Sequence, residues 1–216
     1  MRIVGQSSKW QSYLVIAPLW GVVVFAAFYL LAAALYPGGS NADACQKGFS
    51  LLNNYWCDLL NPYAKNGAFN SSRPVALAAM IVLCSSLICF WYFLPQIFNT
   101  KTATRTTVQI AGIIAMLLTM FVFTKYHDQV INYASLFGAV AFIISFRELY
   151  RSRRYALFGL GLFAWMLCLV CYLIYRTGLF VADLPVIQKI TFFLCLCWFG
   201  IVDFYVYKWT KSCCRC

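Results

Sequence analysis

The sequence predicts an all-α protein, a polytopic transmembrane bundle of six helices. Three observations support this fold class: 63% of the residues are hydrophobic, only 11% are charged, and long apolar runs recur along the chain. Soluble domains carry roughly 25% charged residues. A helix of about 20 apolar residues is long enough to cross about 30 Å of hydrocarbon. Residues 1–216 are therefore expected to form one integral membrane domain.

Six apolar runs are the predicted spans. They cover residues 13–35, 74–93, 108–124, 130–146, 155–175 and 185–207. None shows the polar face at helical spacing that is typical of a soluble helix. The first run exceeds the 7–15-residue core of a signal peptide, so we expect it to remain as a span. Pro18 lies near its start, where proline begins or kinks a helix.

The basic residues predict the orientation of these spans. With the N-terminus inside, 11 of the 17 Lys and Arg residues fall in inner segments and 6 in outer ones. This asymmetry predicts a protein of the cell membrane with both termini in the cytoplasm. It also accounts for the net charge of +11, so nucleic acid is not an expected partner.

The inner loop between the fourth and fifth spans is densely basic. We expect it to contact anionic lipid headgroups, because each basic residue near such a surface is attracted to it. Glu148 is also a candidate ion-pair partner of Arg151, provided that the helix continues that far. The basic residues of this loop are Arg147, Arg151, Arg153 and Arg154.

The first outer loop, residues 37–73, is the longest polar segment of the chain. Apolar and aromatic residues recur at helical spacing from Phe49 to Tyr63, which predicts a short helix lying in the membrane interface. Asp58 falls opposite its apolar face, and Asn61-Pro62 ends it, since the residue before a proline avoids helical angles. A solvated connector with a purely structural role is the alternative.

The cysteines divide into three groups. Cys45 and Cys57 lie on the predicted oxidising side and are either a disulfide or two free thiols. Cysteines inside spans usually act as small apolar residues, which we expect here in preference to redox or metal chemistry. The cysteines just past the last span are candidates for palmitoylation or are free thiols. The span cysteines are Cys168, Cys171, Cys195 and Cys197, and the tail cysteines are Cys213, Cys214 and Cys216.

Several polar residues at the outer face are candidates for a binding site. We expect residues 53–73 to fold over the bundle and close a polar pocket with His127 and Asp128 at its floor. Arg73 would hold an acidic headgroup there or pair with Asp128. A carboxylate beside a histidine tunes an acid or a base. Helix capping is the alternative role for Asp128 and Asp183. The candidate residues are Asn54, Asp58, Asn61, Arg73, His127, Asp128 and Asp183.

Two further features bear on chemistry. Asp203 is the one acid inside a predicted span and is a functional candidate for that reason. Pairing with Lys208 near the inner interface is the alternative. His127 is the only histidine, which argues against a zinc site, since three protein ligands usually hold a catalytic zinc. No metal and no cofactor are expected. The Asn70-Ser71-Ser72 sequon is expected to stay unmodified because it adjoins the second span.

The six-span layout, the Asp58-Leu59-Leu60-Asn61-Pro62 segment and the histidine opening the fourth span resemble uncharacterised bacterial six-helix integral membrane families. The resemblance covers most of the chain as layout and implies no activity or catalytic residues. The Cys45–Cys57 segment and the cysteine tail do not match these families. Our hypothesis is that the protein binds a lipid or small amphiphile at the outer face. The alternatives are a membrane-embedded hydrolase or transferase using His127 with Asp58 or Asp128, and a small transporter using Asp203.

Overall fold

The computed structural model describes residues 9–213, with the side chains of residues 13–212. Residues 1–8 of the predicted N-terminal tail and the tail cysteines Cys214 and Cys216 lie outside this description, whereas the backbone of Cys213 ends the last helix. Six α-helices and two short 3-10 helices make up the described chain. They are α1 (Lys9–Ala34), η1 (Trp56–Leu60), α2 (Arg73–Phe93), η2 (Leu94–Ile97), α3 (Thr102–Thr119), α4 (His127–Arg151), α5 (Tyr155–Thr177) and α6 (Leu184–Cys213).

Each predicted span coincides with one helix. Over residues 9–213 there is no strand, only two isolated β-bridges, so the all-α class is confirmed for this part of the chain. Five helices are long and apolar enough to cross a membrane. These are α1, α2 together with η2, α4, α5 and α6. Five such helices indicate a multi-pass membrane protein.

The third helix begins six residues before its predicted span begins, ends five residues before that span ends, and is not among those five. The predicted span continued to residue 124, but α3 ends at Thr119 and the chain then turns. In this turn the Phe121 N–H donates to the Leu118 carbonyl at 2.9 Å and the Val122 N–H to the Thr119 carbonyl at 3.1 Å. The first turn of α3 is polar and includes Arg105, which leaves a short apolar part.

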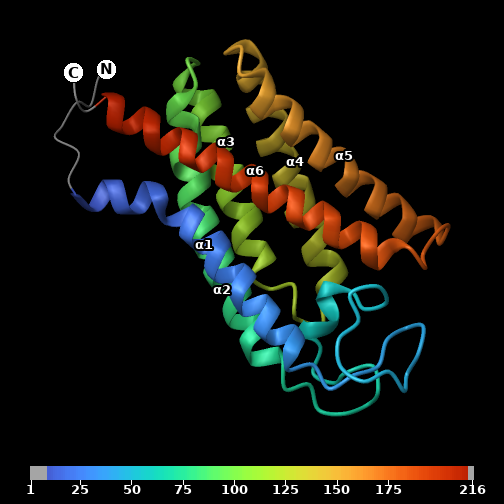
Figure 1. The fold of residues 1–216 in the computed structure, drawn as a ribbon. Helices are drawn as coiled ribbons and strands as arrows, with labels where there is room; N and C mark the ends of the chain where they lie inside the picture. The colour runs from blue at the N-terminus through green and yellow to red at the C-terminus, as the bar shows by residue number, and fades with distance from the viewer. Residues whose placement is uncertain (1–8, 214–216) are drawn as a thin grey trace.

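The connections between helices gather at two ends of the molecule (Figure 1). The loop between α1 and α2 (residues 35–72, hereafter the first loop) and the α3–α4 turn (residues 120–126) lie at one end, which we name the loop end. The η2–α3 and α4–α5 connections (residues 98–101 and 152–154) lie at the other, which we name the basic end. Among the helices, α1 packs on α2 and α6, α3 on α2 and α4, and α5 on α4 and α6.

Glycines let the helices approach closely. A Cβ atom on Gly112 of α3 would lie 2.3 Å from ring carbons of Trp91 on α2. One on Gly21 of α1 would lie 1.9 Å from the Ser86 hydroxyl, and one on Gly161 of α5 would lie 2.5 Å from the Trp198 indole nitrogen. Small residues at such crossings allow van der Waals packing between helices where lipid offers no hydrophobic driving force.

Aromatic rings fill the space between α2, α4 and α6. The centroids of Phe90 and Phe199 are 4.9 Å apart, and those of Trp91 and Phe142 are 5.1 Å apart, both in edge-on geometry. Such pairs contribute about 0.5–1.5 kcal/mol beyond the burial of their area. Trp91 is fully buried and Trp198 is 2% exposed, so this cluster is the centre of the bundle.

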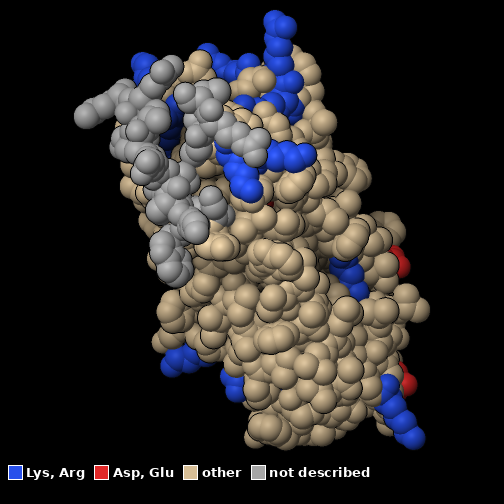
Figure 2. Space-filling view, turned by 60° about the vertical axis from the view of Figure 1, so that its left-hand side comes forward, with Lys and Arg blue, Asp and Glu red and all other residues tan. Residues whose placement is uncertain are grey.

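Charge is unevenly distributed over the surface. On the face that Figure 2 shows, Lys and Arg gather at the basic end, and the middle band is mostly uncharged. An uncharged band between polar ends suits a protein that sits in hydrocarbon. The exposed basic residues of the basic end are Lys101, Arg147, Arg151, Arg153, Lys208 and Lys211.

Candidate functional site

The first loop folds without the interfacial helix that its periodicity predicts. Its only helix is η1, which has five residues, and residues 49–55 form turns and extended chain instead. Leu52 and Tyr63, placed on the predicted apolar face, are 66% and 65% exposed, whereas Leu59 is fully buried. The side chains of Asn54 and Asp58 bond the backbone here, and such bonds compete with helix formation.

Asn54 is a buried hub of the first loop. Its Nδ2 donates to the Gly39 carbonyl at 2.8 Å and to Asp58 Oδ2 at 3.1 Å. Its Oδ1 accepts from the Ser50 N–H at 2.9 Å and from Gln46 Nε2 at 3.1 Å. All four of these bonds are made to residues of the first loop. The Asn54 side chain has no exposed surface. Asn54 therefore holds the loop together and does not face a ligand.

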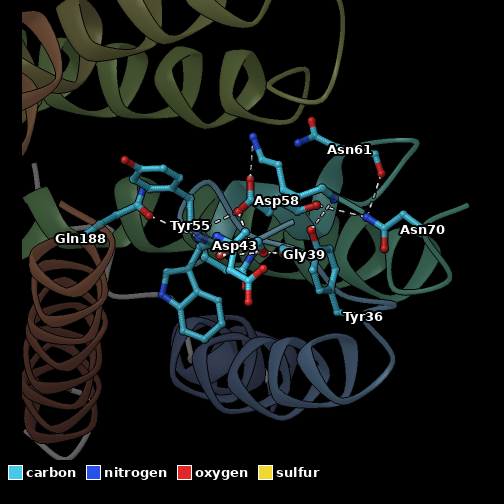
Figure 3. A network of polar contacts seen from close by, with 12 residues as sticks. Tyr36, Gly39, Asp43, Tyr55, Asp58, Asn61, Asn70 and Gln188 are labelled. Carbon is cyan, nitrogen blue, oxygen red and sulfur yellow. Dashed lines mark hydrogen bonds and ion pairs between the residues drawn. The ribbon is translucent and has the colours of Figure 1, made fainter. Parts of the chain in front are cut away.

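Asp58 is buried, although the sequence pattern placed it on the polar side of a surface helix. It is 2% exposed. Its Oδ2 accepts from the Tyr55 N–H at 2.9 Å, and its Oδ1 lies 3.8 Å from Lys65 Nζ. Figure 3 shows Tyr55, Asp58 and Asn70 in one polar network. Burial of a carboxylate is tolerated because hydrogen bonds and a cation surround it.

Asn70 joins η1 to the start of α2. Its Nδ2 donates to the carbonyls of Asp58, Leu59 and Asn61, at 3.1, 3.3 and 2.8 Å. The same nitrogen is the atom that glycosylation would modify, and Asn70 has no exposed surface. Folded protein therefore offers no acceptor at this sequon.

Lys189 of α6 fastens the first loop to the bundle. Its Nζ donates to the backbone carbonyls of Asn54 and of Pro185, the latter at 2.9 Å. The same Nζ lies 5.6 Å from the Phe49 ring centroid and 5.7 Å from that of Trp56. The side-chain oxygen of the neighbouring Gln188, which is labelled in Figure 3, accepts the backbone N–H of Trp56 at 3.3 Å. Sequence periodicity does not indicate the contacts with the first loop, because they join residues more than 130 positions apart.

A hollow of about 290 Å³ lies between the first loop and the α3–α4 turn. It brings together three of the predicted site residues, Asp58, Asn61 and His127. The polar groups lie mainly on the loop side, while Val122 and Phe123 supply apolar surface from the turn. The residues that line it are Asn41, Tyr55, Cys57, Asp58, Leu60, Asn61, Lys65, Val122, Phe123, Thr124 and His127.

The other predicted site residues lie outside this lining. Arg73 Nε donates to the Leu60 carbonyl at 3.1 Å. Arg73 therefore bonds to the backbone of the first loop and does not pair with Asp128. Asp128 has a side chain 79% exposed, and its Oδ1 lies 3.1 Å from His127 Nδ1. Asp183 is exposed, and its backbone carbonyl accepts the N–H groups of Val186 and Ile187 at the start of α6.

The thiol that lines the hollow is protonated near neutral pH. Burial, and secondarily the Asp58 carboxylate, raise the pKa of Cys57 to about 11. Burial also raises the pKa of the neighbouring Tyr55 hydroxyl above its ordinary value. Because the thiolate is the nucleophilic form of cysteine, the hollow does not present an activated thiol. Its chemistry is that of hydrogen bonding, with Asp58 and Lys65 as an acidic and a basic residue in the lining.

For Cys45 and Cys57 the sequence left open a disulfide or two free thiols, and the structure contains no bond between them. Both are free cysteines: Cys45 is exposed, and Cys57 is half-buried in η1. In residues 13–212 no group of three or more His, Cys, Asp or Glu side chains is arranged to hold a metal ion.

Asp203 has a partner other than the predicted Lys208. Its Oδ2 accepts the backbone N–H of Leu19 at 3.2 Å, and the residue is 1% exposed. Leu19 follows Pro18, where α1 bends in Figure 1. A proline in a helix interrupts the backbone bonds of the neighbouring turn. Asp203 thus satisfies a backbone donor at this bend, while Lys208 Nζ lies 4.5 Å from the Phe204 ring centroid.

One of the four arginines predicted to face lipid is held inside the fold. Arg154 donates from Nε to the Tyr205 hydroxyl at 3.0 Å and from Nη1 to the Ile97 carbonyl at 3.2 Å. The predicted Glu148–Arg151 pair is present, with Nη1 and Oε1 3.8 Å apart, because α4 continues to Arg151. Arg147, Arg151 and Arg153 are exposed.

Comparison of the chain with protein-family models, with curated proteins and with solved structures finds no match.

Proposed function

We propose that the protein crosses the membrane six times, with both termini in the cytoplasm, and holds a small amphiphile in the hollow at its loop end. Support for six crossings comes from the hollow itself. Asp58, in the loop that leads into α2, and His127, at the start of α4, line the same hollow. The helices α2 and α4 therefore begin at the same end, and the chain between them must return through α3. The 11-to-6 distribution of basic residues favours the basic end as the cytoplasmic one.

The ligand hypothesis rests on one observation: side chains from two distant segments line a single hollow of about 290 Å³. Asn61 and Lys65 offer hydrogen bonds from the first loop, and His127 offers them from the start of α4. Leu60, Val122 and Phe123 offer apolar surface beside them, and Phe123 is 38% exposed. A polar headgroup in the hollow with its chain along the exposed turn would satisfy both kinds of surface. This is the chemistry of a lipid or a small amphiphile.

The second proposed partner is the lipid of the cytoplasmic leaflet. Arg147, Arg151 and Arg153 are exposed at the basic end, next to Lys208 and Lys211. Basic residues in such a position attract anionic headgroups, each contributing about 1 kcal/mol.

An enzymatic role is the alternative, and the contact between His127 and Asp128 favours it. A carboxylate 3.1 Å from a ring nitrogen orients the imidazole and favours one tautomer. In that case His127 would act as a base on a substrate in the hollow. Turnover of a supplied lipid that His127→Ala abolishes would favour catalysis over binding. A transporter has less support, because the Leu19 N–H accounts for Asp203 without a transported ion.

The proposed binding is tested by the lipids that remain bound to purified protein. We expect native mass spectrometry to detect a retained amphiphile, and His127→Ala or Lys65→Gln to reduce its occupancy about tenfold. A charged hydrogen bond contributes about 1.5–3 kcal/mol, which is consistent with that factor. Lys125→Gln is the matched control, because Lys125 is exposed in the same turn and does not line the hollow. Equal retention in all three variants would refute the site.

A further inference from the structure

Two cysteines of neighbouring helices face each other at the interface between α5 and α6. Sγ of Cys168 on α5 lies 3.7 Å from Sγ of Cys195 on α6. Further along the same interface, Cys171 Sγ lies 3.5 Å from Thr191 Oγ1. Both contacts follow one antiparallel register, so Cys168 and Cys195 are opposite neighbours across the interface. From the sequence alone, these cysteines are expected to act as small apolar residues.

The packing of α5 on α6 holds this pair in place. Gly161 of α5 lies against the Trp198 ring, and Trp198 Nε1 donates to the Leu157 carbonyl at 2.9 Å. A disulfide bond is about 2.05 Å long, so the two sulfur atoms need to approach by less than about 2 Å. Rotation about the side-chain bonds and a small helix shift provide movements of this size.

The arrangement fits a disulfide better than a metal site. A structural metal centre of thiolates usually has four ligands. The other nearby thiol, Cys171, contacts Thr191, and no group of three or more ligating side chains exists among residues 13–212. Two thiols in contact are what a disulfide requires.

The pair borders the lipid-facing surface. Cys168 is exposed, and its neighbours on that surface are the exposed apolar residues Leu169, Val170 and Phe193. Water-soluble oxidants and thiols do not enter hydrocarbon readily, whereas quinones dissolve in it. A lipid-soluble quinone is therefore the class of oxidant that can reach these sulfur atoms.

We propose that Cys168 and Cys195 are a redox-active dithiol, which a membrane quinone oxidises to a disulfide that joins α5 to α6. Two S–H bonds break and one S–S bond forms. The two electrons and two protons pass to the quinone, which becomes the hydroquinone. A hydroquinone can return them and restore the dithiol, so the step is reversible. The disulfide restricts the movement of α5 relative to α6. In the described chain, the main helix contacts of α5 are with α4 and α6. This site is separate from the hollow and does not depend on it.

The test uses the reduced full-length protein in lipid nanodiscs without oxygen, with a short-chain ubiquinone added. We expect about one equivalent of quinone to be reduced per chain, as a two-electron couple requires. After denaturation and alkylation, peptide mass spectrometry should find Cys168 linked to Cys195. Cys168→Ser and Cys195→Ser should each abolish both signals. Cys197→Ser, on the same helix as Cys195, should keep both.

Two results would overturn the proposal. One is full alkylation of Cys168 and Cys195 in the wild-type protein after incubation with the quinone. The other is quinone reduction that continues unchanged in both serine variants. The wild-type measurement is informative even if a serine variant folds poorly.

Discussion

The two ends of the molecule use polar residues in opposite ways. At the loop end, the polar side chains of Asn54, Asp58 and Asn70 are almost completely buried and bonded to the backbone. At the basic end, Arg147 and Arg153 are exposed, and among residues 13–212 neither has an ion-pair partner. A polar segment of a membrane protein is thus not necessarily a solvated one.

The lengths of the connections explain this difference. The first loop contains only one five-residue helix between α1 and α2, so most of its backbone groups lack a helical partner. Buried backbone groups must be hydrogen-bonded, and side-chain amides and carboxylates fulfil that need. The α4–α5 connection is a tight turn of three residues, 152–154, between two helices. It leaves few backbone groups to satisfy, and Arg153, one of its two arginines, remains exposed to the surroundings.

The largest effect is expected from Asn54→Ala. It removes four hydrogen bonds and leaves buried partners, among them the Gly39 carbonyl, without a replacement. Unsatisfied buried groups cost about 1–3 kcal/mol each. We expect a loss of about 3–4 kcal/mol, seen as a fall in melting temperature of about 10 °C in detergent. Asn53→Ala is the control, since the structure gives its side chain no hydrogen bond, and an equal fall in both would contradict the hub.

The environment of Cys57 provides the second test. With its pKa at about 11, the thiolate fraction at pH 8 is about a hundredfold below that of a thiol of pKa 9, the ordinary value. We expect iodoacetamide to modify Cys57 at least about a hundredfold more slowly than the exposed Cys45, as measured by peptide mass spectrometry. Asp58→Asn should accelerate Cys57, because the carboxylate contributes to the raised pKa. Equal rates at the two cysteines would show that the loop end is open to water.

The same thiol predicts a pH dependence of stability. Above pH 9 the thiol of the unfolded chain ionises, while in the folded protein it stays protonated until about pH 11. The contribution of Cys57 to stability is therefore complete below pH 9 and is lost as the pH rises from 9 to 11. Cys57→Ala should remove this part of the alkaline decline in the free energy of unfolding. An unchanged decline in the variant would assign it to other groups.

Neutralising the exposed arginines tests the basic end. Arg147→Gln with Arg153→Gln should weaken the preference for anionic lipid by about 2 kcal/mol in total, measured as lipid enrichment in native mass spectrometry. Stability should remain within about 0.5 kcal/mol, because exposed substitutions rarely change it further. Lys125→Gln, at the loop end, is the matched control. A large loss of stability in the double variant would show that Arg147 and Arg153 serve the fold, as the buried polar residues of the loop end do.

The smallest effect is expected from Arg154→Gln, which distinguishes two adjacent arginines. Arg154 loses its bonds to Tyr205 and the Ile97 carbonyl, whereas Arg153 in Arg153→Gln has no such bonds to lose. We expect a destabilisation of about 1–2 kcal/mol for Arg154→Gln by thermal unfolding. If Arg154→Gln and Arg153→Gln were equally stable, Arg154 would have the lipid-facing role that the sequence predicts and no role in the fold.

The sequence by itself determined the helices. Apolar runs long enough to cross hydrocarbon predicted all six, and the observed ends lie within about six residues of the predicted ones, as expected when run length and local polarity decide. It also indicated which connections between the helices are the most polar. Asp58, Asn61 and His127 were among the candidate site residues that it indicated. The orientation of the termini, the resemblance in layout and the bound ligand remain predictions.

Only the tertiary structure decided which polar residues face a partner and which serve the fold. The bonds from Asp203 to Leu19, from Lys189 to Asn54 and from Gln188 to Trp56 join residues 184, 135 and 132 positions apart. The contact between Cys168 and Cys195 was also decided by the tertiary structure, because it depends on how α5 packs on α6. A local pattern reports the length and polarity of a helix. It carries no information on the angle and depth at which two helices pack, and these set every such contact.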